Sequence, residues 1–419
     1  MSIPHYRGRL ACLGLLIYSL APPAQALSLE DALLRAGQSP EVRASVADAA
    51  AATAEKTAAG RLPDPRLTLS LEDLTLEGEA RYRTGQAKQM VSLMQEIPAT
   101  ARREAERKQA TAEVEASGQM RDFILLAARR EAGLAWLQLY FLQKKEAVLT
   151  AQQAENQHKQ RASTAALAGG GMAEAALEAR LDAQDIQDAQ DELRRDLQLA
   201  RVRLSRWIGP LSASETATGD LPRWAREEPP ETPNPTPAHD NLPQELLASQ
   251  AQIGKAAAEL ALAEAGRDSD WNVEIGVGRD AMGQSMMMAK VGFSLPFFTG
   301  TRQTPKIAAA RLRLEKSEAE HAMRQVEFER QEAEWRFEAA ALKSRLERLR
   351  QETLPLLTQK IALNMAAFSG GQASASALLT AREKRLAALL KIIDLEAEQA
   401  ALRAKLHFLR QRGQEPHHD

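Results

Sequence analysis

The amino-acid sequence predicts a mainly α-helical chain with a β-barrel part, arranged as two repeats of a strand hairpin followed by a long coiled-coil helical hairpin. Three observations predict this fold: landmarks that recur about 200 residues apart, apolar residues at seven-residue intervals, and four segments of alternating apolar and polar residues. The chain has 419 residues, of which 44% are hydrophobic and 26% charged, so it is long enough for two ordinary domains.

Residues 1–26 are expected to be a secretory signal peptide. A charged start precedes a short apolar run over 10–21, and Ala24-Gln25-Ala26 then supplies a small-x-small cleavage site. The run is too short to be a membrane anchor. Cys12 is the only cysteine, and acylation there is not expected because apolar residues follow it. The mature chain is therefore expected to begin at Leu27.

Three landmarks occur twice in the same order, which indicates an internal duplication. The duplication divides the mature chain into a first repeat over 27–209, a second repeat over 242–412 and a polar tail over 413–419. The stretch over 210–241 is rich in proline, which fits neither a helix interior nor a central strand, so it is expected to be a linker. The paired landmarks are Gly60-Arg61 and Gly266-Arg267 before a strand pattern, 92–98 and 292–296 before a long helix, and Gly169-Gly170-Gly171 and Gly370-Gly371 before a returning helix.

Four segments, over about 66–76, 88–97, 271–279 and 285–295, alternate between apolar and polar residues. Alternation with period two places the two kinds of residue on opposite faces of a strand. Each segment has about the length that a tilted strand needs to cross a bilayer. Four strands cannot close a conducting barrel, and open sheet edges are not tolerated in lipid, so transmembrane strands would require several chains to share one barrel. A soluble sandwich face is the alternative.

On the transmembrane interpretation, the apolar residues of these strands face lipid and the polar residues face the lumen. Val273, Ile275, Val291 and Phe293 are expected on the lipid side. The predicted pore-lining residues are Thr68, Ser70, Glu72, Ser92, Asn272, Glu274, Lys290 and Ser294.

Long helices are expected in both repeats, as hairpins over about 99–208 and about 303–411. No proline occurs over 99–168, and apolar residues there recur every seven positions, which is the pattern of a coiled-coil seam. At ~1.5 Å per residue, such a helix reaches on the order of 100 Å. A shorter helix is expected to begin at Ser28, because Asp31 completes a capping-box-like start.

Each helical hairpin is expected to turn at glycines, because glycine adopts the left-handed conformation that a tight turn needs. The length of the helices places these turns at the end of the molecule opposite the strands. Pro355 is expected to kink the second long helix shortly before its turn. The predicted tip residues are Gly169, Gly170, Gly171, Gly370 and Gly371.

The sequence carries no motif for chemistry. It has no Gly-rich phosphate loop, nucleophile elbow or paired-carboxylate motif, so neither an enzyme nor a cofactor is expected. Its histidines lack metal-ligand spacing, and a net charge of −2 without a basic stripe argues against nucleic acid. Met286 and Met288 share the predicted lumen face, where they could contact a soft metal or fill space. No mature segment has the ~18 consecutive apolar residues of a transmembrane helix.

Motifs at equivalent places in the two repeats look like those of a known family. They are Pro63-Asp64-Pro65 before the first strand, Gln95-Glu96-Ile97-Pro98 before the first long helix, Leu295-Pro296-Phe297-Phe298 with Gly300 and Arg302 before the second, and the stretch from Pro355 through Gly371 to Ala381. In this combination the chain resembles the outer-membrane efflux protein family typified by TolC, over nearly its whole mature length. The Pro-Asp-Pro and Gln-Glu-Ile-Pro forms look most like the branch that serves heavy-metal resistance (cation efflux) pumps.

The resemblance implies a homotrimer, with a 12-stranded transmembrane β-barrel in the outer membrane and a trimeric α-helical barrel that extends through the periplasm. It also implies that substrate passes unchanged from an inner-membrane resistance-nodulation-division pump and a periplasmic adaptor protein. An acidic ring narrows the second tip of TolC-type channels, but 364–381 contains no Asp or Glu here, and Glu174 and Glu178 near the first tip are the nearby candidates. The alternative function is a soluble periplasmic coiled-coil adaptor or scaffold, although an adaptor normally has a single hairpin.

Overall fold

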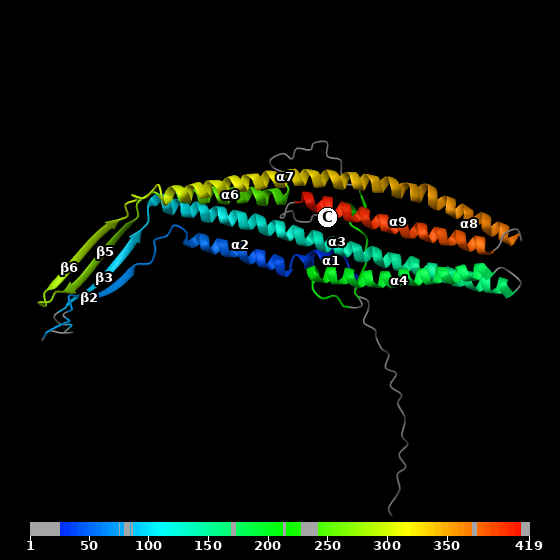
Figure 1. The fold of residues 1–419 in the computed structure, drawn as a ribbon, viewed down its shortest axis with the longest axis horizontal. Helices are drawn as coiled ribbons and strands as arrows, with labels where there is room; N and C mark the ends of the chain where they lie inside the picture. The colour runs from blue at the N-terminus through cyan, green and yellow to red at the C-terminus, as the bar shows by residue number, and fades with distance from the viewer. Residues whose placement is uncertain are drawn as a thin grey trace, which may run out of the picture.

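The computed structural model is an elongated molecule, with a four-stranded sheet at one end and long helices along the rest of its length (Figure 1). The described residues are 26–74, 76–78, 84, 87–168, 173–212, 215–227, 242–370 and 375–411. Several predicted features lie outside them, namely the signal peptide before Ala26, Gly169, Gly170, Gly171, Gly371, much of the proline-rich linker and the tail over 413–419.

The first repeat contains two short helices and two long ones. The first begins at the predicted cap, where Ser28 Oγ accepts a hydrogen bond from the backbone N–H of Asp31 at 3.1 Å. Such a cap satisfies an N–H group that the first turn would otherwise leave unpaired. The helices are α1 (Leu29–Ala36), α2 (Pro40–Ala58), α3 (Thr100–Ala168) and α4 (Ala173–Ile208).

The second repeat has the same arrangement, but its long helix changes form before Pro355. A π-helical turn over Leu349–Thr353 separates two α-helical parts. Proline has no N–H to donate along the helix and its ring crowds the preceding turn, which accounts for the wide turn at the site of the predicted kink. The helices are α6 (Gln244–Ala265), α7 (Gln303–Arg348), α8 (Leu354–Ser369) and α9 (Ala375–Arg410).

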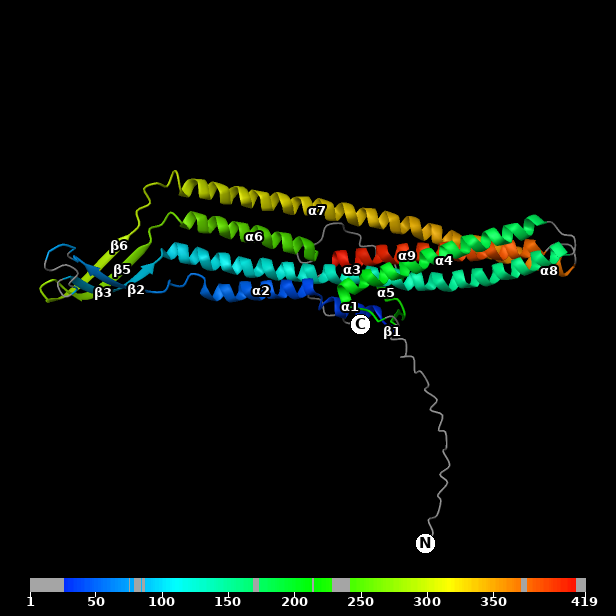
Figure 2. The same ribbon diagram turned by 60° about the horizontal axis from the view of Figure 1, so that its bottom comes forward.

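In each repeat, two shorter helices follow one another alongside the long helix (Figure 2). α2 and α4 lie along α3, while α6 and α9 lie along α7 and α8. The backbone N–H of Gln244 donates to the carbonyl of Gln411 at 3.4 Å, so the start of α6 meets the end of α9. α3 also packs against α6 and α9, and this contact joins the two repeats into one body.

The largest cluster of buried apolar residues lies midway along the helices, where α1, α3, α4 and α9 meet. Trp136 is fully buried there and its Nε1–H donates to the carbonyl of Leu27 at 2.9 Å. Leu204 and Phe408 pack in the same cluster from α4 and α9. The predicted start of the mature chain is thus held in the middle of the molecule.

The linker prediction over 210–241 is incomplete, because part of this stretch is folded. A two-residue strand, β4 (Thr216–Ala217), pairs in parallel with β1 (Ala26–Leu27), and a one-turn helix, α5 (Arg223–Arg226), follows. Both come before the main run of prolines. Pro222 is the cap residue of α5, a position that needs no N–H, so the proline does not oppose this helix.

The sheet is antiparallel throughout, with strand order β2-β3-β5-β6. β3 (Lys88–Ile97) and β5 (Trp271–Arg279) have the predicted bounds. β2 (Arg66–Glu72) ends earlier than the predicted residue 76, because Asp73 has φ 59° and left-handed backbone cannot continue a strand. β6 (Ser285–Phe293) ends before residue 295, ahead of Pro296.

Candidate functional site

The strand register places the predicted pore-lining residues on one face of the sheet. Thr68 lies opposite Ser92, and Glu274 lies opposite Lys290. This polar face carries Thr68, Ser70, Glu72, Ser92, Asn272, Glu274 and Lys290, whereas Ser294 lies one residue beyond the end of β6. Their role in lining a pore stays a prediction.

The opposite face of the sheet is apolar and exposed. Leu69 is 74% exposed, Ile275 56% and Val291 63%, which are high values for large aliphatic side chains in a folded protein. A contiguous apolar surface of this kind indicates contact with lipid or with another chain. The same face carries Leu67, Leu71, Val91, Leu93, Trp271, Val277, Met287 and Phe293, all of them exposed.

Glycines on the polar face allow the strands to approach closely. A Cβ atom at Gly278 would lie 2.1 Å from the carbonyl oxygen of Gln89, and one at Gly292 would lie 2.5 Å from Asn272 Oδ1. Met90 and Ser92 are buried on this face, in contrast to their neighbours on the apolar face. Both observations indicate a sheet that curves toward its polar side.

The start of α3 is tied to the sheet through Asp270. Its carboxylate accepts hydrogen bonds from the backbone N–H of Ala99 at 2.9 Å and from Arg102 Nη1 at 2.8 Å. The backbone of Asp270 also exchanges hydrogen bonds with Ser294, whose Oγ accepts at 3.0 Å. Asp270 therefore fixes the long helix against two strands of the other repeat.

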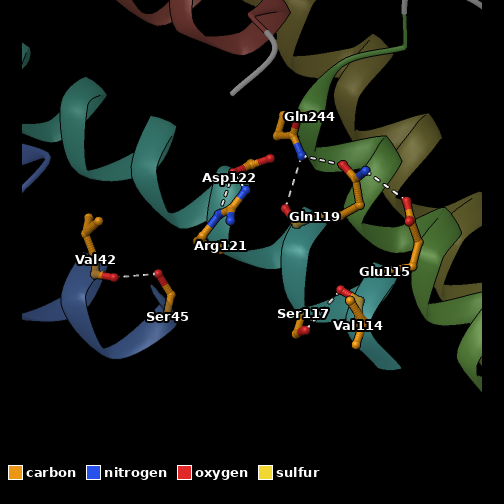
Figure 3. Close-up of polar contacts among 9 residues, drawn as sticks. All are labelled: Val42, Ser45, Val114, Glu115, Ser117, Gln119, Arg121, Asp122 and Gln244. Carbon is orange, nitrogen blue, oxygen red and sulfur yellow. Dashed lines mark hydrogen bonds and ion pairs between the residues drawn. The ribbon is translucent and has the colours of Figure 1, made fainter. Parts of the chain in front are cut away.

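The first third of α3 is joined to α6 through the buried amide group of Gln244 (Figure 3). Gln244 is 3% exposed, and its Nε2 donates to the carbonyl and side-chain oxygens of Gln119 at 3.1 and 2.7 Å. Gln119 in turn donates to Glu115 at 3.1 Å. These hydrogen bonds fix the rotation of α6 on α3 and hence the position of β5, which follows α6.

Toward the far end of the helices, a buried cation joins three of them. Lys159 of α3 is 8% exposed and hydrogen-bonds the carboxylates of Asp182 on α4 and Glu383 on α9. Burial alone would lower the pKa of Lys159, but the two carboxylates raise it above its ordinary value. Burial raises the pKa of Glu383 despite the hydrogen bond from Lys159.

Sequence reasoning missed this cluster, although one signal was available. The seven-residue apolar series of α3 continues through Phe141 and Val148 to Glu155, an acid at a seam position. Glu155 is paired with Arg382 of α9 at 2.9 Å, one turn from Lys159. A charged residue in a coiled-coil seam indicates a specific polar partner. Of the predicted tip glycines only Gly370 is described, as the C-cap of α8.

The described part of the chain contains neither a membrane-spanning helix nor a cluster of candidate metal ligands. No helix there is long and apolar enough to cross a membrane. The same residues contain no group of three or more His, Cys, Asp or Glu side chains arranged to hold a metal ion.

The fold is shared with solved outer-membrane proteins. The outer membrane protein VceC from Vibrio cholerae is 17% identical, with a TM-score of 0.72 over 91% of this chain and 95% of that one. The CmeC outer membrane channel of Campylobacter jejuni is 12% identical, with a TM-score of 0.74 over 99% and 95% of the two chains. The MtrE outer membrane channel of Neisseria gonorrhoeae, solved in an open state, is 15% identical, with a TM-score of 0.73 over 91% and 88%.

No protein-family model matches the sequence, and no curated protein matches it. The chain therefore has the fold of these outer-membrane proteins over 91% or more of its length, at low sequence identity.

Proposed function

We propose that the chain is one subunit of an outer-membrane efflux channel of the TolC-like family, and that three copies form a homotrimer. The observation that carries the proposal is the sheet, which has an exposed apolar face, a polar face and two open edges at β2 and β6. Three such sheets joined edge to edge would form a 12-stranded transmembrane barrel with an apolar outer wall. Closure would also pair the edge strands, whose backbone N–H and C=O groups cannot remain without hydrogen-bond partners in lipid.

The helices support the same assembly. The helical layer has two margins, one formed by α7–α8 and the other by α2–α4 (Figure 1). Both margins carry exposed apolar side chains. In a trimer, one margin would pack against the other margin of the next copy and close a helical barrel, the periplasmic extension. These side chains are Leu312, Val326, Phe337, Leu356 and Leu363 on the first margin, and Val46, Leu177, Leu181, Leu199 and Val202 on the second.

In this role the protein is a passive exit duct and not an enzyme. Substrate would reach the lumen from an inner-membrane resistance-nodulation-division pump through a periplasmic adaptor. α3 and α8 end at the side of the molecule away from the sheet, which supports the proposal that the predicted glycine turns would be the parts nearest the pump (Figure 1). We propose that the adaptor binds at these turns. We also propose that a signal peptide before Leu27 directs the export of the chain.

Heavy-metal cations are the proposed substrate class. The family branch suggested by the sequence motifs supports it, as does the position of Met90, Met286 and Met288 on the polar face. Thioether sulfur is a soft ligand that suits monovalent copper and silver. Strains that lack the gene should become sensitive to silver or copper ions, and unchanged tolerance would remove this part of the proposal.

Conductance and assembly together test the channel. Purified full-length protein should insert into planar bilayers, conduct ions, and give trimers on chemical cross-linking. A soluble adaptor or scaffold would instead leave the outer-membrane fraction under mild extraction and would show no conductance. That result would favour the alternative function.

A further inference from the structure

A groove lined by basic residues lies where the end of α2 meets the start of α3, beside the sheet. Lys56, Arg61, Arg103 and Arg107 line it, and its volume is about 480 Å³. Lys56, Arg61 and Arg107 are exposed, whereas Arg103 is half-buried. The groove therefore brings four positive charges together on one small surface.

These charges are not neutralised within the described part of the chain. Arg103 Nε donates to the carbonyl of Gly60 at 3.0 Å, and no carboxylate among the described residues pairs with any of the four cations. Arg102, one position earlier on α3, is by contrast paired with both Glu106 and Asp270. Four cations without a salt bridge in one groove favour an anionic ligand.

The groove has a fixed shape because α2 ends directly against α3. Gly60 has φ +65°, and a Cβ atom there would lie 2.4 Å from the carbonyl oxygen of Arg103 and 2.8 Å from Arg107 Cγ. Only glycine allows this approach. The approach holds Arg61 beside the two arginines of α3.

One wall of the groove, the segment that begins at Arg61, leads to the apolar side of the sheet. Arg102 points to the polar side, where it meets Asp270, and Arg103 follows it about 100° further around the helix, which has 3.6 residues per turn. The connection from Arg61 to β2 runs on the apolar side, because Gln95, which shares that face with Leu93, donates to the carbonyl of Pro63 at 2.8 Å.

The groove also lies at the depth of a lipid headgroup if the sheet spans a bilayer. Trp271 and Phe293 end the apolar face on the helical side, and Phe297 and Phe298 are 78% and 70% exposed just beyond it. Aromatic side chains gather at the boundary between hydrocarbon and headgroups. Arg103 is six residues past Ile97, three before the start of α3 and three within it, so it lies within roughly 15 Å of that boundary at ~3.4 Å per extended and ~1.5 Å per helical residue.

We propose that this groove binds the phosphate of an anionic phospholipid, in the leaflet on the helical side of the membrane. The inference rests on the proposed function, since it requires the sheet to span a bilayer. Guanidinium groups match phosphate oxygens in pairs of parallel hydrogen bonds, and their apolar stems can lie along the lipid. The groove would fix the depth and tilt of the channel in its membrane.

The test compares lipid binding by two triple variants of the full-length protein in detergent. K56Q/R61Q/R107Q removes three exposed groove cations and leaves Arg103 with its hydrogen bond to Gly60. R161Q/R180Q/K360Q removes the same residue types from exposed positions near the far end of the helices. Binding of phosphatidylglycerol and of phosphatidylcholine is measured by native mass spectrometry.

The wild type and the far-end variant should prefer phosphatidylglycerol, and the groove variant should bind it at least about tenfold more weakly, since each basic residue near an anionic surface contributes on the order of fivefold. Equal binding by the two variants would overturn the proposal, as would displacement of the lipid by inorganic phosphate at equal concentration. Loss of cross-linked trimer in the groove variant alone would assign these cations to the subunit interface instead.

Conductance in a neutral bilayer tests the proposed channel separately from the proposed lipid groove. A wild type that inserts and conducts without preferring anionic lipid contradicts the groove proposal only. A wild type that never inserts contradicts the proposed channel itself.

Discussion

At the scale of single residues, one step along a strand changes the surroundings of a side chain completely. Leu69 lies on the apolar face and is 74% exposed, whereas the next residue, Ser70, lies on the polar face and is half-buried. On the polar face of β3, Ser92 is only 5% exposed. Period-two alternation in the sequence could predict this division, because side chains of a strand alternate between its faces.

A pair of arginine substitutions tests which face meets lipid. Leu69→Arg should cost on the order of 2 to 4 kcal/mol of barrel stability if the residue lies near the bilayer midplane, because the charge would enter hydrocarbon. Ser70→Arg puts the same charge one residue away, on the face proposed to line the lumen, and should change single-channel conductance while leaving the heat resistance of the trimer intact. Equal loss of trimer in both variants would show that the faces are assigned wrongly.

Gly278 gives a second prediction at this scale. Gly278→Ala should destabilise the pairing of β3 with β5, since a methyl group would lie 2.1 Å from the Gln89 carbonyl oxygen and the strands would have to separate. We expect a cost of roughly 1 to 3 kcal/mol, typical of overpacking. Gly118→Ala in α3 is the control, because nothing lies within 4 Å of the added carbon, and it should stabilise by up to ~1 kcal/mol. Thermal unfolding in detergent measures both, and a higher Tm for the Gly278 variant would refute the prediction.

At the scale of elements, the long helices and the strands follow from periodicity, but the contacts between them do not. The seven-residue series predicts α3, because a repeated apolar position needs a partner helix. The series does not show which helices pack against α3. In the structure these are α2, α4 and α9, among others. Residues far apart in sequence decide these contacts. The pairing of Ala26–Leu27 with Thr216–Ala217 was missed for the same reason, since two-residue strands have no period to detect.

The candidate site also has some features that the sequence predicts and others that depend on contacts between distant residues. The polar face could be predicted strand by strand, while its curvature depends on how Gly278 and Gly292 meet atoms of neighbouring strands. The tie between Asp270 and the start of α3 joins residues 171 positions apart. No local pattern in the sequence encodes such a contact.

A double-mutant cycle tests the buried cluster that joins three helices. Lys159 and Glu383 should show a coupling of about 1.5 to 3 kcal/mol, the range for hydrogen bonds to charged groups, when each is changed to Gln. Lys145 and Asp394 also join α3 to α9, at 3.0 Å, but are more exposed, so their coupling should stay below about 1 kcal/mol. Equal coupling in the two pairs would show that burial adds nothing here.

The raised pKa of Glu383 predicts how stability depends on pH. A carboxyl whose pKa rises on folding holds its proton more tightly in the folded state than in the unfolded state. Its contribution to the free energy of unfolding is therefore fully present below the unfolded pKa of 4.5 and is lost as the pH rises through the folded pKa. Glu383→Gln should therefore reduce the fall in Tm on going upward from pH 4.5. Parallel curves for the wild type and the variant would contradict this cause.

At the scale of the whole molecule, the open edges of the sheet predict how copies meet. In a trimer β2 of one copy lies beside β6 of the next, so Leu69→Cys with Val291→Cys should give a cross-linked trimer with a short bifunctional reagent. Leu93→Cys with Ile275→Cys is the control, because these residues are paired within one copy, and it should give cross-linked monomer only. Monomer alone from the first pair, in protein that conducts, would rule out this order of strands.

The exposed apolar face would also set a kinetic problem for a chain that has yet to assemble into the proposed trimer. A single copy cannot shield Leu69, Ile275 or Val291 by itself, and its outer strands are templates for pairing with any other strand. Formation of the proposed trimer would require three copies to meet, whereas aggregation requires only two, so dilution alone would not favour the trimer. The half-life of the unassembled subunit in the aqueous space should thus depend on escorting chaperones, and overproduction of the chain beyond their supply should yield precipitate before it yields more channels.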